Sequence, residues 1–460
     1  MVKFYNIKLG EVCDILNGDR GYNYPSPKDF VEFGIPFINA GCISGTSIKF
    51  DNVDYISEDH YNRLSGAKIK KGDILFCLRG SLGKYALIEF DKGAPASSLA
   101  VLRAYASRLN SHFLLHTLGS DIITNQISMQ NSGSSQPNLS AESVKEFVIP
   151  LPEIFEQNVI AETLSDVDNL ISSLRKLINK KKSIKQGVMQ ELLTGKRRLA
   201  GFNGVWEKKY FGEIFEFMPT NALTREQIGT VGTVKNIHYG DVLTKYGAWL
   251  DADDRTIPVI TDESLINKYS SASYVRSGDV IIADTAEDNT VGKAVEIINV
   301  NTRMLSGQHT MLCRPQEKFA ERFLGYYINS VDFHNQMIPY ITGIKVSSIS
   351  KASLVLLEMD IPPVEEQETI VQILSDMDEE IEQLEKRLAK YQQIKQGMMQ
   401  ELLTGHIRLV ESEEKSQNKT QIIKEPVSQN HNQHFDDAVM IAGIVNAFYS
   451  DKYPLGRKKL

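Results

Sequence analysis

The feature that most constrains the fold is a segment that the chain carries twice. IKQGVMQELLTGKRRL at 184–199 returns as IKQGMMQELLTGHIRL at 394–409, 210 residues later. From Pro152 to Leu199, 25 of 48 positions are identical to those 210 residues further on. A fixed internal period is the sign of a repeated architecture. This period is too long for a solenoid, so the sequence predicts a duplicated half-molecule whose copies are related by a pseudo-twofold axis.

Both copies predict a long helix, of roughly 55 Å at ~1.5 Å per residue. Apolar residues recur at alternating steps of four and three: Ile160, Leu164, Val167, Ile171, Leu174 and Ile178, then Ile370, Leu374, Met377, Ile381, Leu384, Leu388 and Tyr391. This heptad spacing favours a coiled coil over an ordinary amphipathic helix. Proline precedes each helix, at 152 and at 362–363, and Gly195 and Gly405 are expected to cap the ends.

The two helical segments carry opposite charge. Residues 151–199 have a net charge of +3, and residues 361–409 have a net charge of −5. Opposite charges favour pairing within the chain. An antiparallel pair would bring basic residues of the first helix to acidic residues of the second, namely Lys180, Lys181 and Lys182 to Glu379, Glu380 and Glu382. The alternative is that both charged stretches are simply solvated.

The remaining sequence predicts two copies of one α/β (α+β) domain. In residues 1–150, β-rich runs at 34–43, 72–80, 84–90 and 98–105 precede a helical stretch at 108–127 and a last strand at 145–152. Residues 200–360 repeat this order with looser identity. The predicted segments are therefore domain 1 (1–150), a helix (151–199), domain 2 (200–360), a helix (361–409) and a tail (410–460). In the tail we expect a disordered linker and one short helix of no assigned role.

Composition and missing motifs narrow the class. The four cysteines form no C-x-x-C pair, and no apolar run is long enough to span a bilayer, so we expect a soluble, cytoplasmic protein. The net charge of −7, taken over the whole chain, argues mildly against nucleic acid. No P-loop, H-E-x-x-H motif, Pro-Asp dipeptide, metal-binding histidine spacing or glycine-rich cofactor loop occurs. The sequence predicts a chain that positions other molecules and has no catalytic or metal site.

The repeated QGxMQELLTGxxRL, in the order domain, helix, domain, helix, resembles the specificity subunit of type I restriction–modification enzymes. Further phrases that resemble the family are LRGSLGK (78–84), GSSQPNLS (133–140), KNIHYGD (235–241), IADTAEDNTVGK (282–293) and SGQHTML (306–312). The resemblance covers residues 1–409.

This resemblance implies that each domain is a target-recognition domain that reads one half of a bipartite, asymmetric sequence in double-stranded DNA. It implies that the helices are spacers that pack as an antiparallel coiled coil and dock two methyltransferase subunits, which restriction subunits then join. S-adenosylmethionine, ATP and Mg would be bound by those partners, and this chain would bind no cofactor.

Candidate DNA contacts follow from base chemistry, because Arg and Lys suit guanine edges and Asn and Gln suit adenine edges. In domain 1 they are Arg79, Ser81, Lys84, Gln136 and Asn138. In domain 2 they are Lys235, Asn236, His238, Tyr239, Thr285, Asn289, Thr290, Lys293, Gln308, His309 and Lys345. The alternative is ordinary polarity around tight turns. Acidic residues in the second set of loops (Asp284, Glu287 and Asp288) are left out because they would repel phosphate.

Candidate partner contacts lie near the helix ends, where apolar residues occupy more than one face. They are Val188, Met189, Leu192, Leu193, Met398, Met399, Leu402 and Leu403. The alternative is that these side chains fill the chain's own core. Two other functions compete with the resemblance: a non-catalytic coiled-coil scaffold that binds proteins, and a single-chain restriction–methylation enzyme, which the missing motifs disfavour.

Overall fold

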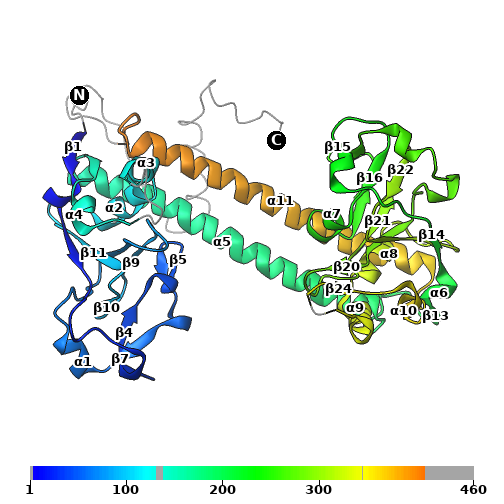
Figure 1. Cartoon of the computed structure of the whole chain (residues 1–460), viewed down its shortest axis with the longest axis horizontal. Coiled ribbons are helices and arrows are strands. Elements are labelled where there is room, and N and C mark those ends of the chain that lie inside the picture. The colour runs from blue at the N-terminus through cyan, green and yellow to red at the C-terminus, as the bar shows by residue number, and fades with distance from the viewer. Residues whose placement is uncertain (1–3, 131–137, 344, 410–460) are drawn as a thin grey trace, which may run out of the picture. The chain divides into compact units, whose positions relative to one another are not determined.

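The computed structural model of the chain describes residues 4–130, 138–343 and 345–409. The chain forms two compact units. Unit 1 comprises residues 1–175 with 386–460, and unit 2 comprises residues 176–385. The division falls inside both long helices, α5 (Ile154–Leu193) and α11 (Val364–Leu402) (Figure 1). Each unit therefore holds one mixed α/β domain and one part of each long helix. The expected tail features and Gln136 lie outside the described residues.

Domain 1 in unit 1 contains two four-stranded sheets. The first is antiparallel, with the order β2 (Cys13–Asn17), β11 (Leu99–Ala104), β8 (Ile74–Cys77), β9 (Tyr85–Leu87). The second has the order β10 (Ala94–Pro95), β4 (Ile35–Ile38), β7 (Asp54–Ile56), β3 (Phe30–Val31). Two separate strand pairs complete domain 1: β1 (Tyr5–Lys8) with β12 (Val148–Leu151), and β5 (Ile43–Ser44) with β6 (Ser47–Ile48). Its helices are α1 (Glu58–Arg63), α2 (Ser111–Leu118), α3 (Asp121–Gln130) and α4 (Ala141–Lys145).

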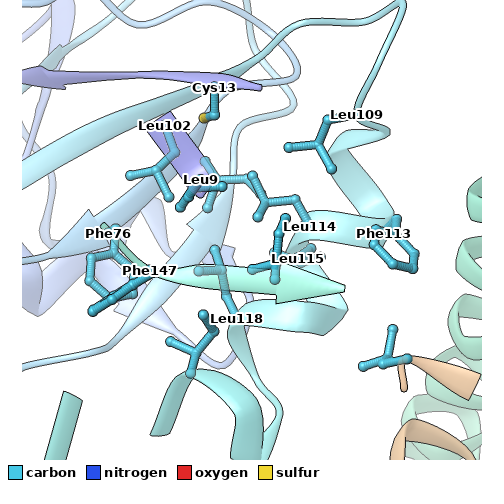
Figure 2. Packing of buried hydrophobic residues seen from close by; sticks show 14 of the residues in the cluster. Leu9, Cys13, Phe76, Leu102, Leu109, Phe113, Leu114, Leu115, Leu118 and Phe147 are labelled. Carbon is cyan, nitrogen blue, oxygen red and sulfur yellow. The ribbon is translucent and has the colours of Figure 1, made fainter. Parts of the chain in front are cut away.

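The core of unit 1 lies between the first sheet, α2 and the long helices. Figure 2 shows Phe76 of β8 beside Phe147, and their ring centres are 6.5 Å apart in an edge-to-face arrangement. Helix α2 contributes Phe113 to the same cluster, and α5 contributes Ile160 and Leu164. Because the helices share this core, domain 1 and its helix segments are stabilised together by burial of apolar surface.

The helical stretch predicted at 108–127 is present in the structure, where it is divided into two helices. Helix α2 ends at Leu118, and α3 begins at Asp121. Between them the Ser120 hydroxyl donates to the Thr117 carbonyl oxygen at 2.6 Å, which satisfies a free carbonyl at the end of α2. A Cβ at Gly119 would lie 2.1 Å from the Tyr85 hydroxyl oxygen, so any larger residue here would require the Tyr85 side chain to move.

Domain 2 in unit 2 has the same two sheets. The first has the order β14 (Phe215–Met218), β23 (Thr310–Pro315), β19 (Val280–Ala283), β21 (Ala294–Ile298), and adds β17 (Trp249–Asp251). The second has the order β22 (Met304–Ser306), β16 (Lys235–Ile237), β18 (Val259–Ile260), β15 (Ile228–Gly229). Two separate strand pairs complete domain 2: β13 (Glu207–Tyr210) with β25 (Glu358–Ile361), and β20 (Thr285–Ala286) with β24 (Ser347–Ser348). Its helices are α6 (Phe211–Ile214), α7 (Tyr239–Thr244), α8 (Phe323–Ile328), α9 (Val331–Met337) and α10 (Lys351–Leu354).

The two main sheets of each domain match in strand order, apart from the added β17. The order β2-β11-β8-β9 corresponds to β14-β23-β19-β21, and β10-β4-β7-β3 corresponds to β22-β16-β18-β15. The mixed pairing also repeats, because β4 with β10 and β16 with β22 are parallel pairs. The predicted duplication of an α/β (α+β) domain is therefore confirmed, although the loops between the strands have diverged.

The long helices begin after the prolines and end before Gly195 and Gly405, as predicted, and both glycines have a positive φ. Ion pairs join the two helical segments within each unit: Asp168–Lys395 and Glu156–Arg408 in unit 1, Lys181–Glu380 and Lys182–Glu385 in unit 2. Over the length of each unit the residue numbers of the partners run in opposite directions, from Glu156–Arg408 to Asp168–Lys395 in unit 1 and from Lys181–Glu380 to Arg198–Glu366 in unit 2. The segments therefore run antiparallel. Lys181 meets Glu380, as predicted, and Lys182 meets Glu385.

Candidate nucleic-acid interface

In domain 1, two of the predicted DNA contacts meet at the turn that follows β8. Arg79 donates through Nε to Oδ1 of Asn138 at 3.0 Å, and the two residues also form an isolated β-bridge. Gly80 and Gly83 both have positive φ, so the turn reverses sharply and returns to β9. Ser81 and Lys84 are exposed on the same turn. The arrangement holds one guanidinium group at the surface, where hydrogen-bond acceptors can approach it.

In domain 2, three segments bring predicted residues into one cluster. After β16, His238 stands at the N-cap of α7 and Tyr239 is the first residue of that helix, and their ring centres are 4.6 Å apart. The loop between β22 and β23 carries Gln308 and His309, and the His309 ring meets Tyr239 edge to face at 5.3 Å. The loop after β19 carries Asp284, whose Oδ1 lies 3.6 Å from His309 Nδ1. We call these five residues the histidine cluster.

Hydrogen bonds set the protonation of His238. Its Nδ1 accepts from the Gly240 N–H at 3.1 Å, so the ring proton is on Nε2. Burial lowers the pKa of His238, and the nearby Arg225 charge lowers it further. Arg225 itself forms a two-bond pair with Asp241, at 2.6 and 2.9 Å. His238 is therefore a neutral hydrogen-bond donor at pH 7.

Three predicted contacts are used inside domain 2. Asn236 is fully buried, and its Oδ1 accepts from the Asn221 amide at 2.7 Å, so it offers no surface to DNA. Lys235 Nζ donates to the carbonyl oxygens of Ala252 and Asp254, and Lys293 Nζ donates to that of Leu243 at 2.9 Å. These bonds hold the ammonium groups against the backbone, which corrects the expectation that they face a phosphate or a base.

The other predicted residues of domain 2 are spread over neighbouring loops. Thr285 donates through Oγ1 to Asp284 at 2.7 Å and so borders the histidine cluster. Thr290 donates its N–H to Asp288, which fixes an exposed turn that also carries Asn289. Lys345 is exposed beside β24. These placements leave their DNA contact a prediction.

Asp284 is one of the three acidic residues that were not predicted to contact DNA. It was excluded because a carboxylate repels phosphate, but its Oδ1 accepts from Thr285 and faces His309. Its negative charge is thus directed at its own neighbours. A sequence signal existed in the adjacent Thr285, since a hydroxyl next to an aspartate often bonds to it, but the meeting with His309 depends on the fold.

The predicted partner contacts divide by burial. Five of them are buried in the core of their own unit: Leu192, Leu193, Met398, Leu402 and Leu403. They leave almost no area for another protein, in agreement with the intramolecular alternative. Val188, Met189 and Met399 are only partly buried against the same cores, so these three keep apolar surface that a partner could cover.

Among the described residues, no three or more His, Cys, Asp or Glu side chains gather as metal ligands would, and all four cysteines are buried as free thiols. No helix in that part of the chain has the length and apolar character of a membrane span.

The family model of the type I restriction modification DNA specificity domain matches residues 1–185 and again residues 204–396. A Methanocaldococcus jannaschii protein assigned as the MjaX type I restriction enzyme specificity subunit is 26% identical over 429 residues, which span 87% of this chain and 94% of that protein.

Two solved structures share the fold. One, from a study of complex assembly and conformational transition in the type I restriction–modification system, has a TM-score of 0.55 at 20% identity and covers 88% of this chain and 99% of its own. The other, the S subunit of a type I system from M. genitalium, has a TM-score of 0.52 at 16% identity and covers 87% of this chain and 96% of its own.

Proposed function

The chain belongs to the family of type I restriction–modification DNA specificity domains, and from this premise we propose that it selects the DNA sequence on which such a complex acts. Each domain reads one half of a bipartite target in double-stranded DNA. Two linked readers bind better than either alone, because the second contact is intramolecular and its effective concentration is high.

The observation that carries this proposal is a repeated scaffold with unlike loops. Arg79 and Asn138 meet after β8 in domain 1, and Thr285 and Ser348 occupy the corresponding paired positions after β19 in domain 2. Side chains of different hydrogen-bonding pattern select different base edges. Two domains of one fold with different groups at the same loops are expected to read different sequences, so the target is asymmetric.

In this proposal the long helices form an antiparallel coiled coil that docks two methyltransferase subunits, and restriction subunits join them. Support for the packing comes from the heptad residues: Ile160, Leu164, Val167 and Ile171 are buried in the core of unit 1, and Leu388, Tyr391 and Ile394 pack against the same core. Val188, Met189 and Met399 are the apolar residues left for docking. The chain itself is non-catalytic, and S-adenosylmethionine, ATP and Mg are handled by the partner subunits.

A competition assay tests the proposal. The chain is produced with the methyltransferase subunit of its own system, and its retention of a labelled random duplex library is followed through rounds of selection. We expect one split sequence to be enriched, with the salt dependence of a phosphate-contacting complex. Binding that stays independent of sequence in every round contradicts the proposal and favours a protein-binding scaffold.

A further inference from the structure

His309 has a strained backbone at the tip of a loop. Its φ is +55°, and only Asn299 and Arg322 share a positive φ among the non-glycine residues that the structure describes. Such a conformation costs on the order of 1 kcal/mol or more and persists where surrounding contacts hold it, often at functional sites. The corresponding residue of domain 1, Ser98, accepts the matching backbone hydrogen bond without a positive φ. The fold alone therefore does not require the strain at His309.

The His309 ring is fixed on several sides. Its Nδ1 faces the Asp284 carboxylate at 3.6 Å, and its edge meets the Tyr239 ring at 5.3 Å, which is itself packed on His238. Since Asp284 accepts hydrogen bonds only, the ring proton of a neutral His309 belongs on Nδ1. Its Nε2 is then an acceptor, and it lies 3.3 Å from Nε2 of Gln308.

This chain of contacts orients the Gln308 amide. One of its two N–H groups donates to His309, which leaves Oε1 and the second N–H for a ligand. An acceptor beside a donor is the pattern that pairs with N6 and N7 of adenine in the major groove. We infer that Gln308 reads an adenine in the half-site of domain 2. His309, held by Asp284, is the residue that positions the Gln308 amide. The inference rests on the proposed function.

Domain 1 has no histidine cluster at the corresponding positions. Matching backbone hydrogen bonds align the two domains. The Gly307 N–H donates to Ile237 in domain 2, as the Ala96 N–H donates to Ile38 in domain 1. Likewise the Asp284 N–H donates to His309, as the Leu78 N–H donates to Ser98. By this alignment, the histidine cluster His238, Tyr239, Asp284, Gln308 and His309 corresponds to Asn39, Ala40, Leu78, Ser97 and Ser98. Domain 1 has Ser97 at the position of Gln308 and therefore has no amide there, so the adenine contact belongs to one half-site only.

The test uses the chain with its methyltransferase partner and sequencing of methylated DNA. In the Gln308→Ala variant, one required A·T pair in one half of the target should tolerate other bases, with discrimination falling about tenfold to a hundredfold. Gln308→Arg should move the preference at that position to G·C, because arginine pairs with O6 and N7 of guanine. The other half of the target should not change in either variant.

Positioning is tested with variants that keep the fold. His309→Gly suits a positive φ and should not lower the unfolding temperature, yet it should relax the same base position as Gln308→Ala. Asn299→Gly makes the same backbone change at a residue outside the cluster and should leave the target unaltered. Asp284→Asn keeps an acceptor for Nδ1–H and should retain discrimination, whereas Asp284→Leu, which installs the domain 1 residue, should lose it.

The outcomes separate the two proposals. A bipartite target that persists unchanged in Gln308→Ala overturns the adenine contact and leaves the proposed function standing. Relaxation in Gln308→Ala without relaxation in His309→Gly overturns the positioning role alone. If the wild-type complex methylates DNA without sequence preference, the proposed function itself is wrong.

Discussion

His116 and Tyr326 occupy corresponding positions, 210 residues apart, against the long helices of their own units. His116 Nε2 lies 3.2 Å from the Ser165 hydroxyl, and Nδ1 lies 3.8 Å from Asp168. The pKa of His116 is lowered to about 4, chiefly by burial and also by the charges of Lys395 and His112, while the charge of Asp168 opposes this shift. The effect of Asp168 on the pKa of His116 is outweighed, because its carboxylate is already paired with Lys395 at 2.6 Å. His116 is therefore neutral in the folded unit at pH 7.

Unit 1 should consequently lose stability in mild acid. The unfolded chain, with a histidine pKa near 6.5, takes up the proton first, so stability present above pH 6.5 falls as the pH drops towards 4. Between pH 7.5 and 5.5 this group should cost about 1.4 kcal/mol. His116→Tyr, which copies Tyr326 of unit 2, should remove that part of the loss. Urea unfolding at the two pH values measures it, and an equal acid loss in both proteins would show that His116 is not its source.

One arginine–glutamate pair connects the two helical segments in each unit. Arg198 follows α5 and binds Glu366 near the start of α11 through two hydrogen bonds of 2.7 Å. Arg408 follows α11 and binds Glu156 near the start of α5 in the same two-bond geometry. Both glutamates are almost completely buried. The pairs give a structural reason for the arginine that both copies of the repeated segment carry.

Removing the arginine should be costly, because it leaves a buried carboxylate without its cationic partner. Arg408→Met is expected to destabilise unit 1 by about 3 kcal/mol or more, and Arg198→Met should do the same in unit 2. Arg197→Met is the matched control, since this side chain is 76% exposed and meets Glu191 only at 3.5 Å, and it should cost less than about 0.5 kcal/mol. Denaturant unfolding provides the comparison. A cost for Arg408→Met no larger than that of Arg197→Met would contradict the structural role of the pair.

At the scale of the whole chain, local patterns predicted more than distant ones. The helix limits followed from heptads, prolines and capping glycines, all of which are readable within a few residues. The Arg408–Glu156 pair joins residues 252 apart, and nothing near either residue signals it.

Some features of the candidate site could likewise be predicted from the sequence, and others depend on the fold. Residue type was enough to single out Gln308 and His309, but the strain at His309 and its meeting with Asp284 depend on three segments coming together. Lys235 and Lys293 were expected at the surface, and a sequence does not show that backbone carbonyl groups will bind their ammonium groups.

The central claim is that two domains of one fold read two unlike half-sites. Exchange of residues 1–150 for the corresponding domain of another family member, followed by sequencing of methylated DNA from a host that carries the partner subunits, tests it most directly. The account predicts that one half of the target changes and that the other half, including the adenine assigned to Gln308, stays the same. A change in both halves, or in neither, would contradict it.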